Sequence, residues 1–276
     1  MTTLERYPGS KPPRSRRSEV ARDYAFGDTD EAAQRLGVLA DIFDPASEAF
    51  LANQVSRPPT LAVDLGCGPG HSTRLLARVT RATRTVGLDN SESFLAAARK
   101  NAAGGLAFLT HDVRNTPWPV AGADLAFSRL VLAHLPEPAA VTMTWLAQLA
   151  PGGLLALDEL EWFHTDDPAL DRYLEIATAL VTAHGGTMLA GPILAELDPV
   201  PMGRHQASMV REWEVAVPRA AAMFGLNLAV WRRDPLVPAS QAELDELSRE
   251  LDALASAQVS GGTMTWGLRQ VVLQSQ

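Results

Sequence analysis

Glycines and acids recur where short apolar runs end, and they form the clearest chemical signal in this chain. Residues 61–65 (Leu-Ala-Val-Asp-Leu) indicate a buried parallel strand with Asp64 near its carboxyl end. The following turn contains Gly66, Gly68 and Gly70, which permit a sharp bend and a close approach of backbone to ligand. Apolar residues then recur at helical spacing, so the turn opens into a helix whose amino terminus faces the same ligand. Strand, turn and helix together predict half of a nucleotide-binding unit.

Two kinds of nucleotide ligand use such a turn, and the glycine spacing distinguishes them. A dinucleotide fingerprint has the spacing GxGxxG, whereas this turn reads GxGxG and is followed by His71. Pro69 also removes one backbone N–H that a pyrophosphate would use. The spacing therefore disfavours NAD.

The string V-D-L-G-C-G-P-G, residues 63–70, closely resembles the first motif of the class I S-adenosylmethionine (SAM)-dependent methyltransferases. The resemblance implies an α/β fold with a doubly wound, Rossmann-like sheet of seven strands, the seventh antiparallel. It also implies SAM as the methyl donor, S-adenosylhomocysteine as its product, and no metal. The predicted cofactor contacts in this motif are Asp64, Gly66, Cys67, Gly68 and Gly70.

Asp89 ends the next predicted strand, about twenty residues beyond the glycine turn. A carboxylate there can accept two hydrogen bonds from the cis-diol of a ribose. The same side chain could instead cap the helix that begins at Asn90-Ser91-Glu92, and the two roles are compatible. We predict that Asp89 binds the ribose and that Asn90 lies beside it.

Further cofactor contacts are implied by the resemblance at the ends of two later strands. Asp112 matches the acid that contacts the adenine amino group, and Val113 would offer the ring a backbone N–H; otherwise Asp112 is a surface acid. Ser128 and Arg129 match the segment beside the methionine part of SAM. Arg129 is equally compatible with an ion pair to a structural carboxylate. A Pro-Gly-Gly turn at 151–153 completes the family's order of landmarks.

Methyl transfer is an in-line displacement at an activated sulfonium, so the protein mainly aligns the reactants and excludes water. An oxygen acceptor usually needs a base, an amine only has to lose its proton, and an electron-rich carbon needs none at first. The candidates for a base are His134, Glu159 and His164, which follow predicted strands at their carboxyl ends. Each of these three residues is also compatible with a structural role; for His134 that role is a histidine of the core.

Aromatic side chains in the second half of the chain predict an apolar substrate pocket, although at least half of them suit a plain core. The predicted pocket residues are Trp162, Phe163, Trp213, Phe224, Trp231 and Tyr24. Tyr24 is included because its surroundings resemble the entry segment of small-molecule methyltransferases from bacterial secondary metabolism, where a tyrosine covers the cofactor. The expected substrate is a hydrophobic natural product, aromatic or terpenoid, methylated on carbon, nitrogen or oxygen. SAM-dependent cyclisation, a binding module and protein methylation remain alternatives.

Composition changes divide the chain into four regions. Residues 1–17 are expected to form a disordered basic arm, and residues 18–56 a helical lid of two helices separated at Pro45. The SAM-binding core is expected at 57–165. Residues 166–276 would supply cap helices and the last two strands, with a helical insertion between those strands.

The charge balance and the single cysteine exclude several classes of function. A formal net charge of −8 argues against nucleic acid, whose binding draws on clustered Lys and Arg. The sequence has no run of eighteen apolar residues, so we expect no membrane partner and a cytoplasmic location. Cys67 is the only cysteine, which excludes an internal disulfide and a cysteine-based metal cluster. A homo-oligomer is compatible with the sequence.

Overall fold

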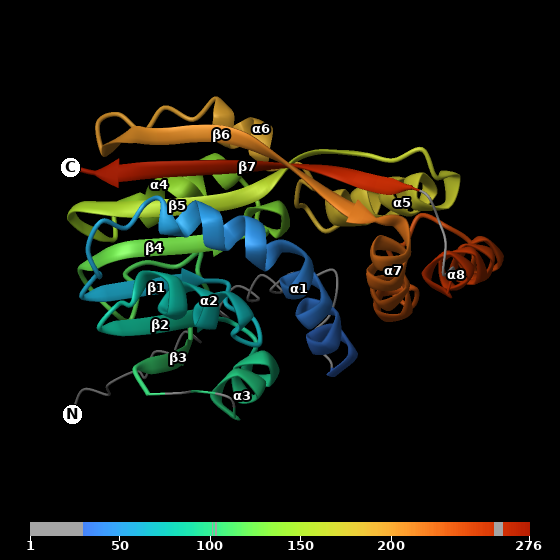
Figure 1. Cartoon of the computed structure of the whole chain (residues 1–276), viewed down its shortest axis with the longest axis horizontal. Coiled ribbons are helices and arrows are strands. Elements are labelled where there is room, and N and C mark those ends of the chain that lie inside the picture. The colour runs from blue at the N-terminus through green and yellow to red at the C-terminus, as the bar shows by residue number, and fades with distance from the viewer. Residues whose placement is uncertain (1–29, 101, 103, 257–261) are drawn as a thin grey trace, which may run out of the picture.

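The computed structural model describes residues 30–276 except 101, 103 and 257–261. Its strands form one seven-stranded sheet in the order β3-β2-β1-β4-β5-β7-β6 (Figure 1). Neighbouring strands from β3 to β5 are parallel, and β7 is antiparallel to both β5 and β6. The bounds are β1 (Leu61–Leu65), β2 (Arg84–Asp89), β3 (Leu106–Thr110), β4 (Ala123–Arg129), β5 (Leu149–His164), β6 (Gly203–Ala216) and β7 (Thr263–Ser275). The expected Rossmann-like sheet with an antiparallel seventh strand is confirmed.

Helices cover both faces of this sheet, because alternate side chains of a strand point to opposite faces. On one face Phe127 of β4 packs with residues of α1 and α2. On the other face Ala126 of the same strand packs with Trp145 of α4 and Leu194 of α6. The helices are α1 (Asp30–Ala52), α2 (His71–Thr80), α3 (Glu92–Lys100), the 3-10 helix η1 (Leu132–His134), α4 (Pro138–Leu146), α5 (Pro168–Ala183), α6 (Gly191–Ala195), α7 (Val217–Trp231) and α8 (Gln241–Ser256).

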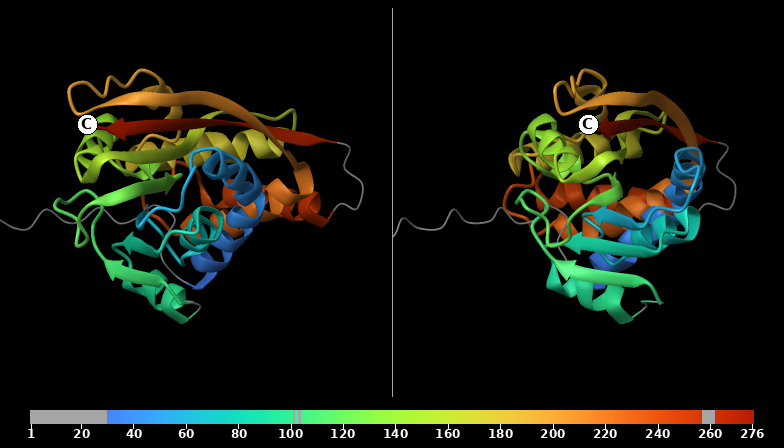
Figure 2. Two further views of the ribbon diagram at one scale, coloured as in Figure 1. Left: turned by 60° about the vertical axis from the view of Figure 1, so that its left-hand side comes forward. Right: turned by 90° about the vertical axis from the view of Figure 1, so that its left-hand side faces the viewer.

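Three long strands carry the helical cap beyond the parallel part of the sheet. The ribbons of β5, β6 and β7 continue past β1 to β4, and α5, α7 and α8 gather at their far end (Figure 1). The predicted insertion between the last two strands is the pair α7 and α8. Helix α1 contacts α7, and Figure 2 shows both helices at the same end of the sheet. The cap therefore faces the carboxyl ends of the parallel strands.

The prediction of two helices separated at Pro45 is wrong, because α1 is a single helix with Pro45 inside it. Proline removes one helical hydrogen bond, so the helix needs support on both sides of this residue. Buried Phe43 and Ala46 flank Pro45, and both belong to the core beneath the cap. Tertiary packing outweighs the local preference here.

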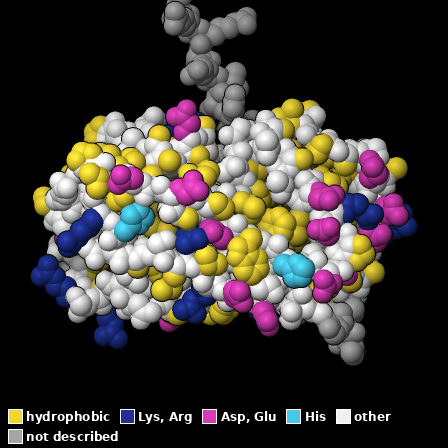
Figure 3. All heavy atoms as spheres, turned by 90° about the horizontal axis from the view of Figure 1, so that it is seen from above, with side chains coloured by type: hydrophobic (Ala, Val, Ile, Leu, Met, Phe, Trp, Pro, Cys, Tyr) yellow, Lys and Arg dark blue, Asp and Glu magenta, His cyan; other side chains and the backbone are white. Residues whose placement is uncertain are grey.

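The edge strand β6 presents most of its side chains to solvent. Met209 and Val210 are exposed there, and Figure 3, a view onto this side, shows hydrophobic side chains interspersed with charged ones. In the part of the chain that the structure describes, no helix has the length and apolar character needed to cross a bilayer.

Candidate functional site

The glycine turn adopts backbone conformations that side chains would obstruct. Gly66, Gly68 and Gly70 have φ angles of 72°, 50° and 84°, in the left-handed region that favours glycine. A Cβ on Gly66 would lie 2.6 Å from Val131 Cγ2. The N–H groups of Gly66 and Cys67 both donate to the carbonyl of Leu88, at 2.8 and 3.0 Å. The turn is thereby fixed to the end of β2.

The turn lines a cavity of about 500 Å³ at the carboxyl ends of the parallel strands. Gly66, Cys67 and Gly68 contribute to this lining, whereas Gly70 and Asp64 do not. Gly70 packs against Phe108, which a Cβ there would approach within 2.9 Å. Gly70 and Asp64, two of the predicted cofactor contacts, therefore lie outside the cavity lining and support the shape of the turn.

Asp64 anchors helix α2 to β1. Its Oδ2 accepts hydrogen bonds from Ser72 Oγ at 2.7 Å and Thr73 Oγ1 at 2.6 Å. Burial raises the pKa of Asp64 to about 6, although these hydroxyl donors counteract the shift. The carboxyl group thus helps to orient the helix amino terminus toward the cavity.

Cys67 is a packing residue rather than a nucleophile. Its side chain is buried in the small cluster that contains Leu95 and Phe108. Burial raises the pKa of the thiol well above its ordinary value, and the nearby Asp64 adds to the shift. A thiol in this environment stays protonated and unreactive.

Asp89 links the glycine turn to the start of α3. Its Oδ2 accepts from the N–H of Gly68, and its Oδ1 accepts from the N–H of Ser91, both at 2.8 Å. The helix cap is Ser91 instead, because its Oγ accepts from the N–H of Phe94 at 3.2 Å. Asp89 and Asn90 both line the cavity. A carboxylate in a cavity wall can accept hydrogen bonds from the hydroxyls of a ribose.

Asp112 and Val113 line the cavity beside Asp89, at the end of β3. Arg114 donates to both carboxylate oxygens of Asp112, from Nε at 2.9 Å to Oδ1 and from Nη2 at 2.6 Å to Oδ2. These bonds lower the pKa of Asp112. The carbonyl of Val113 accepts from the indole of Trp145 at 2.8 Å. Both predicted adenine contacts are thus held in place by neighbours.

Arg129 joins β4 to α1 and also lines the cavity. Its Nη1 donates to Asp44 Oδ1 at 2.8 Å and to Ser47 Oγ at 3.2 Å. Ser47 in turn donates to Asp158, inside β5, at 2.7 Å. The structural ion pair considered from the sequence is therefore present. Ser128 is buried outside the lining, so its predicted contact with SAM has no support from its position.

Glu159 lies behind the segment that follows β4. It is buried, and its Oε1 accepts from the N–H groups of Val131 and Leu132 at 2.9 and 3.0 Å. Burial raises the pKa of Glu159 to about 8, so the carboxyl group is mostly protonated at neutral pH. It does not line the cavity. Glu159 therefore positions Val131 and Leu132 rather than meeting a substrate.

The two predicted histidine bases have different surroundings. His134 lines the cavity, but burial, with Arg35 and His184 nearby, lowers its pKa to about 3. A base with so low a pKa takes a proton poorly at neutral pH. His164 ends β5 with 70% of its side chain exposed, and it lies outside the lining. Tyr24 falls outside the described residues.

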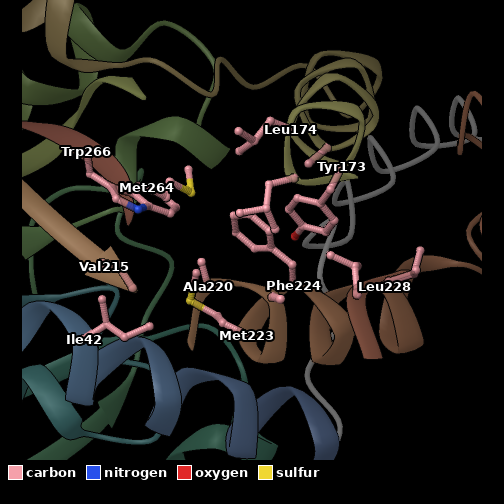
Figure 4. Close-up of a cluster of buried hydrophobic side chains, with 14 of the residues drawn as sticks. Ile42, Tyr173, Leu174, Val215, Ala220, Met223, Phe224, Leu228, Met264 and Trp266 are labelled. Carbon is pink, nitrogen blue, oxygen red and sulfur yellow. The ribbon is translucent and has the colours of Figure 1, made fainter. Parts of the chain in front are cut away.

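The far end of the cavity is aromatic. Tyr173 of α5 stacks on Phe224 of α7, with ring centroids 3.9 Å apart and planes 11° apart. Figure 4 shows these rings together between the two helices, with Trp266 of β7 nearby. All three side chains line the cavity, and so do Leu174 and Met223. The glycine turn and this apolar wall thus border one continuous space.

Of the aromatic residues predicted for the pocket in the described part, only Phe224 lines it. Trp162 packs over Gly267, where a Cβ would come within 2.4 Å of the indole. Trp213 donates its indole N–H to the carbonyl of Ile42 at 2.9 Å, and Trp231 is buried in the core behind Tyr173. Phe163 packs at the edge of the same core.

The sequence interpretation missed several lining residues, namely Arg35, Tyr173, Leu174, Ala177, His184, Asn227 and Trp266. Tyr173, Ala177 and His184 recur at intervals that place them along one side of α5 and its end. Such spacing predicts a buried helix face, but it does not distinguish a face that packs in the core from one that lines a cavity.

The residues of this site fit SAM. Glycines without a Cβ face the cavity, the carboxylate of Asp89 lines it, and the volume suits a small-molecule site. Among the residues that the structure describes, there is no group of three His, Cys, Asp or Glu placed to hold a metal ion.

Comparisons with known proteins agree with this fit. The family described as "Methyltransferase domain" matches residues 63–157. Trans-aconitate 2-methyltransferase of Methylobacterium radiotolerans is 33% identical over 219 residues, which cover 75% of this chain and 83% of that protein. Enzymes of the same name from Methylobacterium nodulans and Acidovorax sp. match over 51% and 50% of their own length.

Solved structures show the same fold at low sequence identity. A Bacillus halodurans C-125 protein provisionally named a methyltransferase has a TM-score of 0.56 and 15% identity, covering 83% of this chain and 98% of that one. Coclaurine N-methyltransferase bound to N-methylheliamine and S-adenosylhomocysteine has a TM-score of 0.51 and 15% identity, covering 84% and 72%. With its glycine turn, sheet order and close relative, this chain belongs to the class I SAM-dependent methyltransferases.

Proposed function

We propose that this methyltransferase acts on a hydrophobic, ring-bearing small molecule, such as an aromatic or terpenoid natural product. The observation that carries the proposal is the single cavity that joins the glycine turn to the stacked pair of Tyr173 and Phe224. Aromatic faces bind rings well, and they stabilise a cation if one develops. The volume of about 500 Å³ leaves space for an acceptor beside the cofactor.

SAM supplies an electrophilic methyl group to this site. The chain's own part is to hold the acceptor atom in line with that group and to exclude water. We propose that Asp89 binds the ribose, that Asp112 and Val113 bind the adenine, and that Arg129 lies at the methionine end. Helix α1 supports the predicted lid, because its Leu36, Leu39 and Phe43 contribute to the cavity wall.

A carboxylic acid is a second candidate acceptor. The relatives described above are named for trans-aconitate, and Arg35, only 3% exposed, places a cation in the cavity wall of this chain. A carboxylate is already ionised at neutral pH and needs no base. The apolar wall favours a less charged molecule than a tricarboxylate, because burying unpaired charge is costly.

Filling the far end of the cavity should separate acceptor binding from cofactor binding. Ala177 lies in the middle of α5 and lines the cavity, so Ala177→Phe should occupy acceptor space. We expect methyl transfer from labelled SAM to fall by at least about tenfold through a higher KM, with up to about 3 kcal/mol of overpacking strain. Affinity for S-adenosylhomocysteine, measured by calorimetry on folded protein, should not change.

Ala177→Ser is the matched control, because it adds little volume at the same position. Full activity of Ala177→Phe would place the acceptor elsewhere and contradict the proposal. Equal losses of acceptor turnover and cofactor affinity would also contradict it, because one end of the cavity could then not be distinguished from the other.

A further inference from the structure

A histidine and a carboxylate pair at the acceptor end of the cavity. His184 Nε2 lies 2.8 Å from Asp234 Oδ2, and both side chains are mostly buried. His184 follows α5 and lines the cavity, whereas Asp234 follows α7. The second carboxylate oxygen of Asp234 accepts from the N–H of Leu236 at 2.8 Å. The carboxylate is therefore fixed by backbone and can hold the imidazole in one orientation.

The loop after His184 ties this pair to the segment that follows β4. The N–H of Thr187 donates to the carbonyl of Ala133 at 2.8 Å, and a Cβ on Gly186 would lie 2.3 Å from that same oxygen. His134 lies next to Ala133, and its electrostatic neighbours are Arg35 and His184. Arg35 of α1 and His184 after α5 thus lie near His134 of η1, and Asp234 after α7 contacts His184.

Three described histidines line the cavity, and their partners differ. His71 lies 3.3 Å from Arg74, and burial lowers its pKa. His134 has Arg35 nearby and a lowered pKa. His184 Nε2 has the carboxylate of Asp234 within hydrogen-bond distance. A carboxylate stabilises the imidazolium that forms when a histidine accepts a proton, so His184 is suited to act as a base.

Asn227 indicates which acceptor chemistry the site accommodates. This residue of α7 is 6% exposed and lines the cavity. Its Nδ2 donates to the hydroxyl of Tyr173 at 2.6 Å, and its Oδ1 is buried with no hydrogen-bond partner. A buried carbonyl oxygen of this kind gains from a hydrogen-bond donor and is repelled by a carboxylate. The acceptor therefore carries donors at this end.

We propose that His184, oriented by Asp234, accepts the proton of an acceptor hydroxyl, so that oxygen is the methylated atom. The inference rests on the proposed function, because it needs an acceptor in this cavity. The O–H bond breaks as the oxygen–methyl bond forms, and the sulfur keeps the electron pair of the broken sulfur–methyl bond. The proton resides on the His184 imidazole beside Asp234 and then passes to water.

The test compares acceptors that differ in their need for a base. 2-Naphthol stays protonated at neutral pH, 4-nitrophenol is largely ionised at pH 8, and 2-naphthoate is already an anion. Transfer of labelled methyl from SAM is measured with each probe for wild type, His184→Gln and Asp234→Asn. We expect His184→Gln to lose about 100-fold in kcat with 2-naphthol and to keep its activity with 4-nitrophenol. Asp234→Asn should lie between wild type and His184→Gln.

Controls separate a base from a structural contact. Arg172→Gln breaks another ion pair between cap helices, Arg172 with Glu250, away from the cavity lining. It should lower the melting temperature without a selective loss on 2-naphthol. Binding of 2-naphthol and of 2-methoxynaphthalene to the complex with S-adenosylhomocysteine gives a readout without turnover. Wild type should bind 2-naphthol more tightly than 2-methoxynaphthalene. His184→Leu should reduce this ratio of affinities about fivefold.

Four results would overturn the assignment. Equal losses of His184→Gln on 2-naphthol and 4-nitrophenol would show a structural role. A wild type that methylates 2-naphthoate faster than 2-naphthol would show a carboxylate site. Failure of all three probes to bind would overturn the proposed ring-bearing acceptor and the base together, whereas normal binding with unimpaired His184→Gln would overturn the base alone.

Discussion

Replacing Asp89 with alanine should weaken the binding of S-adenosylhomocysteine by about 10-fold to 100-fold, or about 1.5–3 kcal/mol. The carboxylate lines the cavity and already accepts hydrogen bonds from Gly68 and Ser91. Alanine would remove the proposed ribose ligand, and it would also release the glycine turn from the start of α3. Calorimetric titration of the folded variant measures the loss directly.

Asp89→Asn is the matched control for this variant. Its Oδ1 can still accept one hydrogen bond, so it should lie between wild type and Asp89→Ala. Asp112→Ala should weaken binding less, because Arg114 occupies both oxygens of that carboxylate. Wild-type affinity in Asp89→Ala would refute the ribose assignment, whatever the effect on stability.

Glu159→Gln should flatten the pH dependence of stability. The folded pKa of Glu159 is about 8, whereas an ordinary glutamate has a pKa of 4.5. Between these values the folded state keeps a proton that the unfolded state has lost. The contribution of Glu159 is therefore fully present below pH 4.5 and is lost as the pH rises through 8, with a slope of at most about 1.4 kcal/mol per pH unit.

Urea denaturation of wild type and Glu159→Gln from pH 5 to pH 9 measures this difference. Gln keeps an oxygen for the N–H groups of Val131 and Leu132, so cofactor affinity should survive. Asp64→Asn is the comparison variant. Asp64 has a pKa of about 6, so its contribution to stability should change in the lower part of this pH range. Parallel stability profiles for wild type and Glu159→Gln would show that this carboxyl group ionises normally.

The cofactor half could be predicted from the sequence because its information is local. The glycine turn directly follows β1, and Asp89 ends β2, its neighbour in the sheet. Parallel strands place such residues at a common edge. The glycine spacing disfavoured a dinucleotide, and the resemblance then supplied SAM as the ligand.

The acceptor half was harder to predict because its wall comes from distant segments. Tyr173, Phe224 and Trp266 belong to three different elements and meet only in the folded cap. On β5, Leu160 lines the cavity, and strict alternation would place Trp162 beside it. The pairing with β7 shifts by one residue between these two positions, so the alternation fails there.

Histidines at strand ends were an uncertain guide for a related reason. Sequence places His134 and His164 after strands but gives neither burial nor partners. The structure shows His134 buried near Arg35 and His164 in solvent. His184 became a candidate only because Asp234, fifty residues later, folds back against it.

The antiparallel pairing of β5 and β7 sets an order for making this protein on the ribosome. Leu160 of β5 pairs with Leu268 of β7, roughly a hundred residues later in the chain. This antiparallel pairing cannot form until Leu268 has been synthesised. The strands that hold the glycine turn pair with one another much earlier in synthesis. We expect the cofactor-binding half of the nascent chain to fold first, while the apolar wall of the cap stays exposed until β7 has been synthesised. Chaperone engagement should therefore peak in that interval of translation.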